Sequence, residues 1–94
     1  MNWIEVIDLR ATMGGREILK QMLLKPLKEN NRKSGLKKIA LYYNASVETD
    51  TSIQLQWENE ENGPEKSNFG LQLASALEEF GRVNHSIWIE DLGV

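Results

Sequence analysis

The chain has 94 residues, of which 40% are hydrophobic and 27% charged, and its formal net charge is −3. These values are typical of a folded domain, so we expect one domain over residues 1–94. The absence of cysteine excludes disulfides, thiolate metal ligands and a cysteine nucleophile. The first residues, MNWIEVID, lack the basic and apolar regions of a signal peptide, and no apolar run has the length of a membrane span. We therefore expect a cytoplasmic protein without a membrane partner.

Hydrophobic spacing divides the chain into six elements. In chain order these are a strand over 2–10, a helix over 16–32, strands over 37–44 and 52–58, a helix over 68–80 and a strand over 83–90. The order βαββαβ is that of the ferredoxin-like α+β fold. It predicts a four-stranded antiparallel sheet with two helices on one face and the other face open.

Local signals refine these bounds. Pro26 lies within the first helical stripe, so it should kink or end that helix. Ser67 is a suitable N-cap for the second helix, and Gly81 stands where a left-handed residue would end it. The residues between the second and third strands lack an Asn-Gly turn, which predicts a longer hairpin loop.

The open face is the place where function is expected. Strand alternation predicts that seven polar or aromatic side chains occupy it, namely Tyr42, Asn44, Gln54, Gln56, Asn84, Ser86 and Trp88. The topology puts the first and third strands in the middle, so Gln54 and Gln56 should lie near the centre. We favour a homodimer interface that combines apolar anchors with an amide network, ahead of a ligand cavity between two such faces and a solvated face.

Charge is unevenly distributed, because basic residues concentrate in the first half of the chain and acidic residues in the second. One interpretation is a solvated helix face, and the other is electrostatic complementarity between two copies. A nucleic-acid partner is not expected, because the domain is acidic overall and its third strand carries glutamines where RNA-binding sheets carry stacking rings.

Single residues give weaker signals. His85 is the only histidine, and its strand phase turns it toward the helices, where a satisfied core residue is the favoured interpretation. No second ligand accompanies it at a metal-binding spacing, so the sequence predicts neither a metal site nor a cofactor. Gly14 and Gly15 precede a helix, which fits turn chemistry better than an anion site. No catalytic motif is present, and the catalytic residues stay unknown.

The segment GLKKIALYYNASVETDTSIQLQWENEE resembles the dimeric α+β barrel superfamily, and especially its antibiotic-biosynthesis-monooxygenase group. The resemblance implies a homodimer formed through the open sheet faces. Some members of this group oxidise polycyclic substrates without a cofactor and others degrade haem. The haem-degrading branch resembles this chain at Trp57 and pairs that residue with a helix-borne histidine, which the helix over 68–80 lacks. No haem ligand is therefore implied.

Two hypotheses for function follow. The first is a homodimeric barrel that binds or oxidises a small apolar or aromatic ligand in a cavity between the sheet faces. The second is a non-catalytic regulatory or interaction module that binds a small metabolite or protein partner, at Gly14-Gly15 or along the basic helix. The sequence does not decide whether the protein is an enzyme.

Overall fold

The computed structural model describes residues 2–11, 17, 19–23, 35–58 and 64–94. The elements in this part of the chain are β1 (Asn2–Ala11), β2 (Leu36–Tyr43), β3 (Asp50–Glu58), α2 (Asn68–Leu77) and β4 (Gly81–Ile89). Residues 17 and 19–23 are helical, within the range predicted for the first helix. Pro26, Gly14 and Gly15 lie outside the described residues, so the kink and the anion-site interpretation stay predictions.

The four strands form one antiparallel sheet in the order β2-β3-β1-β4. This order confirms the ferredoxin-like α+β fold and the central position of the first and third strands. Strict alternation explains β3, where Ile53, Leu55 and Trp57 are buried and the residues between them are half-buried. The sheet therefore has one face in the core and one that is turned outward.

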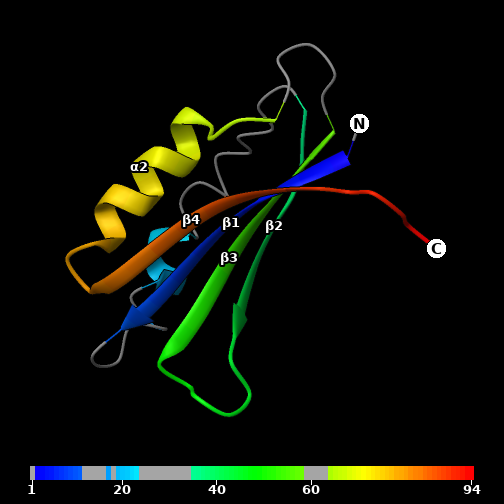
Figure 1. The fold of residues 1–94 in the computed structure, drawn as a ribbon. Coiled ribbons are helices and arrows are strands. Elements are labelled where there is room, and N and C mark those ends of the chain that lie inside the picture. Colours follow the sequence, from blue (N-terminus) through cyan, green and yellow to red (C-terminus); the bar gives the residue numbers. More distant parts are fainter. Residues whose placement is uncertain (1, 12–16, 18, 24–34, 59–63) are drawn as a thin grey trace.

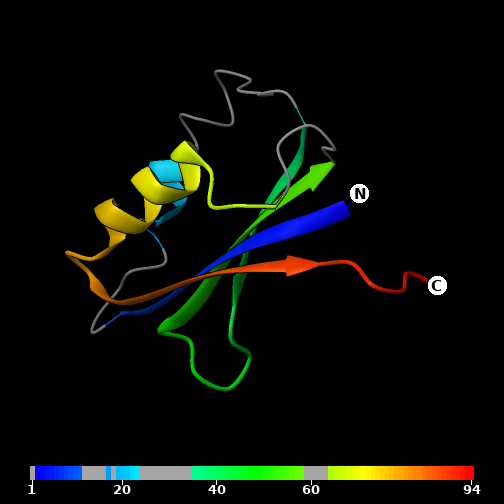
Figure 2. The same cartoon turned by 45° about the horizontal axis from the view of Figure 1, so that its top comes forward.

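The helices lie on one face of the sheet, and the described part of the chain leaves the other face bare (Figures 1 and 2). The core between the two layers is apolar, and its least exposed side chains are those of Ile7, Leu9, Leu19, Ile53, Leu55 and Leu77. Trp3 and Trp57 stack within it as a cross-strand pair, with ring centroids 5.5 Å apart. Because of this layering, the bare face of the sheet is the surface that is available to bind other molecules.

Ser67 is the N-cap of α2, as predicted, since its hydroxyl accepts a hydrogen bond of 2.9 Å from the backbone N–H of Gly70. The prediction for the other end was wrong. The helix ends at Leu77, and Gly81 is the first residue of β4 rather than a left-handed cap. Among the described glycines, the positive φ belongs to Gly35, which precedes β2 with a φ of 90°.

The β2–β3 connection is a multi-residue loop, as the sequence predicts. Asn44 organises it, because its Oδ1 accepts hydrogen bonds from the backbone N–H groups of Ser46 (2.8 Å) and Val47 (3.0 Å). The backbone N–H of Asn44 donates to the backbone carbonyl of Asp50 over 2.8 Å, and this hydrogen bond closes the loop. Asn44 therefore follows β2 as a loop residue instead of extending the strand.

Candidate functional site

The bare face of the sheet, which we call the open face, is arranged in rows across the four strands. One row reads Lys38, Gln56, Ile4 and Trp88, and the next reads Ala40, Gln54, Val6 and Ser86. A third row reads Tyr42, Ser52, Asp8 and Asn84. Apolar side chains on β1 are thus flanked by the glutamines of β3.

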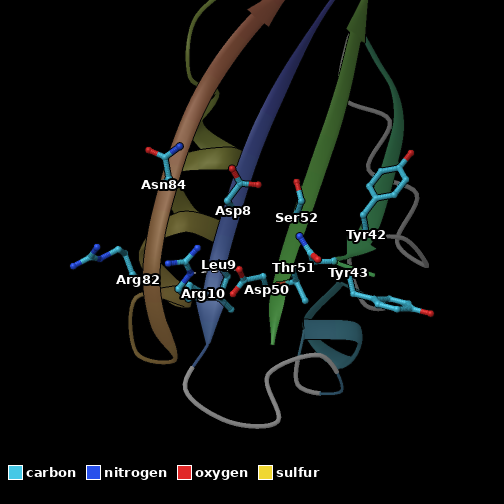
Figure 3. A pocket seen from close by; sticks show the side chains of 11 residues that line it. Asp8, Leu9, Arg10, Tyr42, Tyr43, Asp50, Thr51, Ser52, Arg82 and Asn84 are labelled. Carbon is cyan, nitrogen blue, oxygen red and sulfur yellow. Dashed lines mark ion pairs between the residues drawn. The ribbon is translucent and has the colours of Figure 1, made fainter. Parts of the chain in front are cut away.

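A depression of about 500 Å³ lies at the end of the open face that carries the β2–β3 loop. We call it the hairpin-end depression, and its lining includes Asp8, Arg10, Tyr42, Asp50, Ser52 and Asn84. Figure 3 shows that these side chains come from all four strands. Aromatic side chains, those of Tyr42 and Tyr43, therefore stand beside several hydrogen-bonding groups in a space that suits a small organic molecule.

Charges in this depression are only partly paired. Nε of Arg10 lies 3.4 Å from Oδ2 of Asp50, while the other carboxylate oxygen, Oδ1, is buried without a hydrogen-bond partner among the described residues. Arg82 stands directly opposite Arg10 across the β1–β4 pair. Like charges in that position repel each other, and the carboxylates of Asp50 and Asp8 in the same lining balance the two arginines.

A second depression, of about 460 Å³, lies at the opposite end of the sheet. We call it the far-end depression, and its lining includes Ile4, Lys37, Gln54, Gln56, Trp57 and Trp88. The indole N–H of Trp88 donates to the hydroxyl of Ser86 over 2.9 Å, so the strand that carries Trp88 also supplies its acceptor. Trp88 as a whole is 60% exposed, which leaves apolar surface in water.

The seven residues predicted for the open face are thus divided between two depressions. Tyr42, Asn44 and Asn84 line the hairpin-end depression, and Gln54, Gln56 and Trp88 line the far-end depression. Ser86 lines neither depression, and its hydroxyl accepts the hydrogen bond from Trp88. The sequence did not single out Asp8, Arg10 or Asp50, although their even-numbered phase along β1 and β3 puts them on the same face as Gln54.

A polar cluster is buried on the other side of the sheet, under the first turn of α2. Its centre is the carboxylate of Glu5, which is fully buried. Oε1 accepts hydrogen bonds from the indole N–H of Trp57 (3.0 Å) and the hydroxyl of Ser67 (2.6 Å). Oε2 accepts from the backbone N–H of Ser67 (3.1 Å) and lies 2.7 Å from Nε2 of His85. Four groups therefore satisfy one buried carboxylate.

The order of groups in this cluster argues for a positioning role. The Ser67 hydroxyl donates to Glu5 and accepts from Gly70, so its hydrogen and an oxygen lone pair are both engaged. The carboxylate stands between the serine and the histidine, whereas nucleophile activation needs the histidine beside the serine. The cluster also lies at a helix N-terminus, where the backbone dipole stabilises a negative charge. It fixes the start of α2 on the sheet.

His85 is a satisfied core residue, as predicted, since its side chain is 7% exposed and bonded to Glu5. Sequence reasoning missed its partner. Glu5 alternates in phase with Trp3, Ile7 and Leu9, all of which are buried. An acid in phase with a buried strand face must be surrounded by paired groups, but this phase is hard to recognise in the sequence because β1 has apolar residues on both faces.

No group of three or more His, Cys, Asp or Glu residues that could hold a metal ion occurs among the described residues. Within the same part of the chain, no helix is long and apolar enough to cross a membrane.

Solved structures share this architecture. A candidate antibiotic biosynthesis monooxygenase from Bordetella bronchiseptica is 12% identical to the chain, with a TM-score of 0.69 over 97% of this chain and 98% of that chain. The protein Rv0793 from Mycobacterium tuberculosis is 14% identical to the chain, with a TM-score of 0.67 over 100% of this chain and 98% of that chain. No family model and no curated protein matches the chain. The two matches confirm the fold that the sequence resemblance implied, and at these identities they establish the fold alone.

Proposed function

We propose that two copies of this chain associate through their open faces and bind a small aromatic compound with hydrogen-bonding groups in the space that they enclose. The observation that carries this proposal is that each row of the open face is complementary to the same row of a second copy turned about a two-fold axis.

A two-fold axis that runs along the strands, midway between two facing sheets, brings β1 of one copy over β3 of the other. Ile4 then faces the partner's Gln56, and Val6 faces the partner's Gln54. Arg10 faces the partner's Asp50, which carries the opposite charge. Facing sheets cross at about 30°, so this matching is best near the centre of the face. No row of the described face sets like charges against each other.

The hairpin-end depression supports the choice of ligand. Two such depressions face each other at the same end of the proposed dimer, because the axis along the strands preserves strand direction. The volume of about 500 Å³ in one copy falls in the range of small-molecule sites. Tyr42 supplies a ring for stacking, and Asp8, Ser52 and Asn84 supply acceptors and donors. The similarity to an antibiotic biosynthesis monooxygenase agrees with a ligand of this kind.

The association is tested by sedimentation velocity over a range of concentrations. The wild-type chain should sediment as a dimer at micromolar concentration, and Val6→Lys should shift it toward the monomer by placing a charge at the centre of the interface. Leu71→Lys, at an exposed position of α2, is the matched control and should not change the distribution. A wild-type chain that is monomeric throughout, or a Val6→Lys variant that stays dimeric, would contradict the proposal.

The ligand is tested by native mass spectrometry of the purified wild-type protein, followed by titration with the aromatic probe 8-anilinonaphthalene-1-sulfonate. We expect a retained small molecule on the dimer, or saturable binding of the probe that Val6→Lys abolishes together with dimerisation. Binding of the probe with equal affinity to monomer and dimer would count against an enclosed site.

A further inference from the structure

The hairpin-end depression holds two pairs of opposite charges, and only one pair is in contact. Arg10 and Asp50 form the ion pair. Asp8 and Arg82 line the same depression, yet neither makes an ion pair or a hydrogen bond within the part of the chain that the structure describes. Two opposite charges that stay apart in one depression are available to a bound molecule.

Asp8 and Arg82 stand on neighbouring strands. Asp8 of β1 pairs with Asn84, and Arg82 of β4 pairs with Arg10, so the two charges are diagonal neighbours across the β1–β4 pair. Such positions are about 7–8 Å apart. Figure 3 shows the Asp8 side chain between those of Asn84 and Ser52, whereas the Arg82 side chain extends past the edge of β4. The acid therefore lies within the depression and the base lies at its rim.

The second copy in the proposed dimer leaves both charges unpaired. The two-fold axis sets Asp8 against the partner's Ser52 and Arg82 against the partner's Asn44, and neither of these carries a charge. Arg82 also lies near a corner of the face, at the start of the edge strand β4, where two crossed sheets overlap least. An anion brought by the ligand would relieve the repulsion between Arg82 and Arg10.

We propose that the ligand of the hairpin-end depression is a zwitterionic aromatic compound, of which an aromatic amino acid is the simplest kind. This inference rests on the proposed function and names the chemical class of its ligand. The ammonium group binds the Asp8 carboxylate, and the carboxylate group binds the Arg82 guanidinium at the rim. The ring extends toward β2, two strand spacings or about 10 Å from β1, and stacks on Tyr42.

The spacing of the strands suits this class of compound. Neighbouring strands are about 4.8 Å apart, and the ammonium and carboxylate groups of an amino acid share one carbon, so the two groups can reach side chains of adjacent strands. An aromatic compound with a single charge would gain one of the two contacts and leave the other side chain unpaired. A compound with both charges engages Asp8 and Arg82 together.

The first test compares three indoles by isothermal titration calorimetry with the wild-type dimer. L-Tryptophan carries both charges, tryptamine lacks the carboxylate, and indole-3-propionate lacks the ammonium group. L-Tryptophan should bind at least about tenfold more tightly than either analogue, because each analogue loses one charge-assisted contact. Equal affinities of the three compounds overturn the proposal.

The second test assigns each charge to its residue. Arg82→Gln should abolish the preference for L-tryptophan over tryptamine, and Asp8→Asn should abolish the preference over indole-3-propionate. Both positions are exposed, so neither substitution removes a core contact. Lys20→Gln, on the helix side of the sheet, is the matched control and should change none of the affinities. Preferences that survive both substitutions contradict the assignment.

Failure of this ligand class can be distinguished from failure of the enclosed site, because 8-anilinonaphthalene-1-sulfonate tests the site separately. A dimer that binds this probe but shows no preference among the indoles overturns the zwitterionic class and keeps the enclosed site. A dimer that binds neither the probe nor any indole, or a chain that never dimerises, overturns both.

Discussion

Nε2 of His85 lies 2.7 Å from Oε2 of Glu5, in the core beneath α2. The two residues come from the neighbouring strands β4 and β1. Glu5 is in phase with the buried Ile7 and Leu9, and His85 is in phase with Val83 and Ile87, which pack against the core while partly buried. A buried carboxylate is costly unless it is fully hydrogen-bonded. Trp57 and Ser67 complete its shell, so the cluster joins three strands to the start of one helix.

Glu5→Gln should lower the free energy of unfolding by about 1–3 kcal/mol. The amide has one acceptor oxygen, so either the indole N–H of Trp57 or the backbone N–H of Ser67 loses its acceptor. Urea denaturation measures the change. Glu58→Gln, which affects only an exposed pair with Lys37, should cost less than about 0.5 kcal/mol. Equal effects of the two substitutions would show that the cluster adds no stability.

Gly70→Ala should destabilise the protein, although Gly→Ala in a helix commonly stabilises by up to about 1 kcal/mol. A Cβ at position 70 would overlap the Glu5 carboxylate. We expect a loss of about 1–3 kcal/mol in thermal or urea denaturation. In a Glu5→Asp background, where the carboxylate is withdrawn by one methylene, the same substitution should cost less. Additive effects of the two changes would contradict this explanation.

Trp88 offers a direct probe of association, because it is 60% exposed while Trp3 and Trp57 are 4% and 6% exposed. Acrylamide should quench one accessible tryptophan population in the dilute protein, and this population should shrink as concentration rises and the open faces meet. Trp88→Phe should remove it at every concentration. Quenching that is independent of concentration would mean that Trp88 stays in water.

Tyr42→Ala and Gln54→Leu distinguish the two depressions as ligand sites. Loss of the Tyr42 ring should weaken binding of 8-anilinonaphthalene-1-sulfonate by about three- to tenfold, the range of an aromatic contact. Gln54→Leu alters the far-end depression and should change the affinity less while leaving the dimer folded. Titration monitored by probe fluorescence measures both. The opposite ranking would place the ligand at the far end.

Much of the fold could be predicted from the sequence, because apolar and polar residues alternate regularly along β2, β3 and β4, and in β3 burial alternates in the same way. The N-cap at Ser67 was also predictable, because a hydrogen bond between residues close in the sequence defines it. The helix end was not, because Gly81 suits both a left-handed cap and the start of a strand. The choice depends on where β4 meets Ala11 of β1.

The candidate site was less predictable. Alternation placed Gln54 and Tyr42 on the open face, yet it did not show that they line different depressions, because depressions depend on side-chain size across neighbouring strands. Glu5 was missed because β1 has apolar residues on both faces, which obscures the phase of a single acid. Only the pairing of β1 with β4 brings Glu5 near His85.

The buried cluster also bears on how the chain folds. Its contacts join Glu5 to residues 52, 62 and 80 positions further along the chain, so none of them can form locally. Contacts of such separation slow folding, because loop-closure entropy is lost before they form. The carboxylate acquires its last partner only when β4 docks beside β1. Completion of the core and addition of the final strand are therefore one cooperative event.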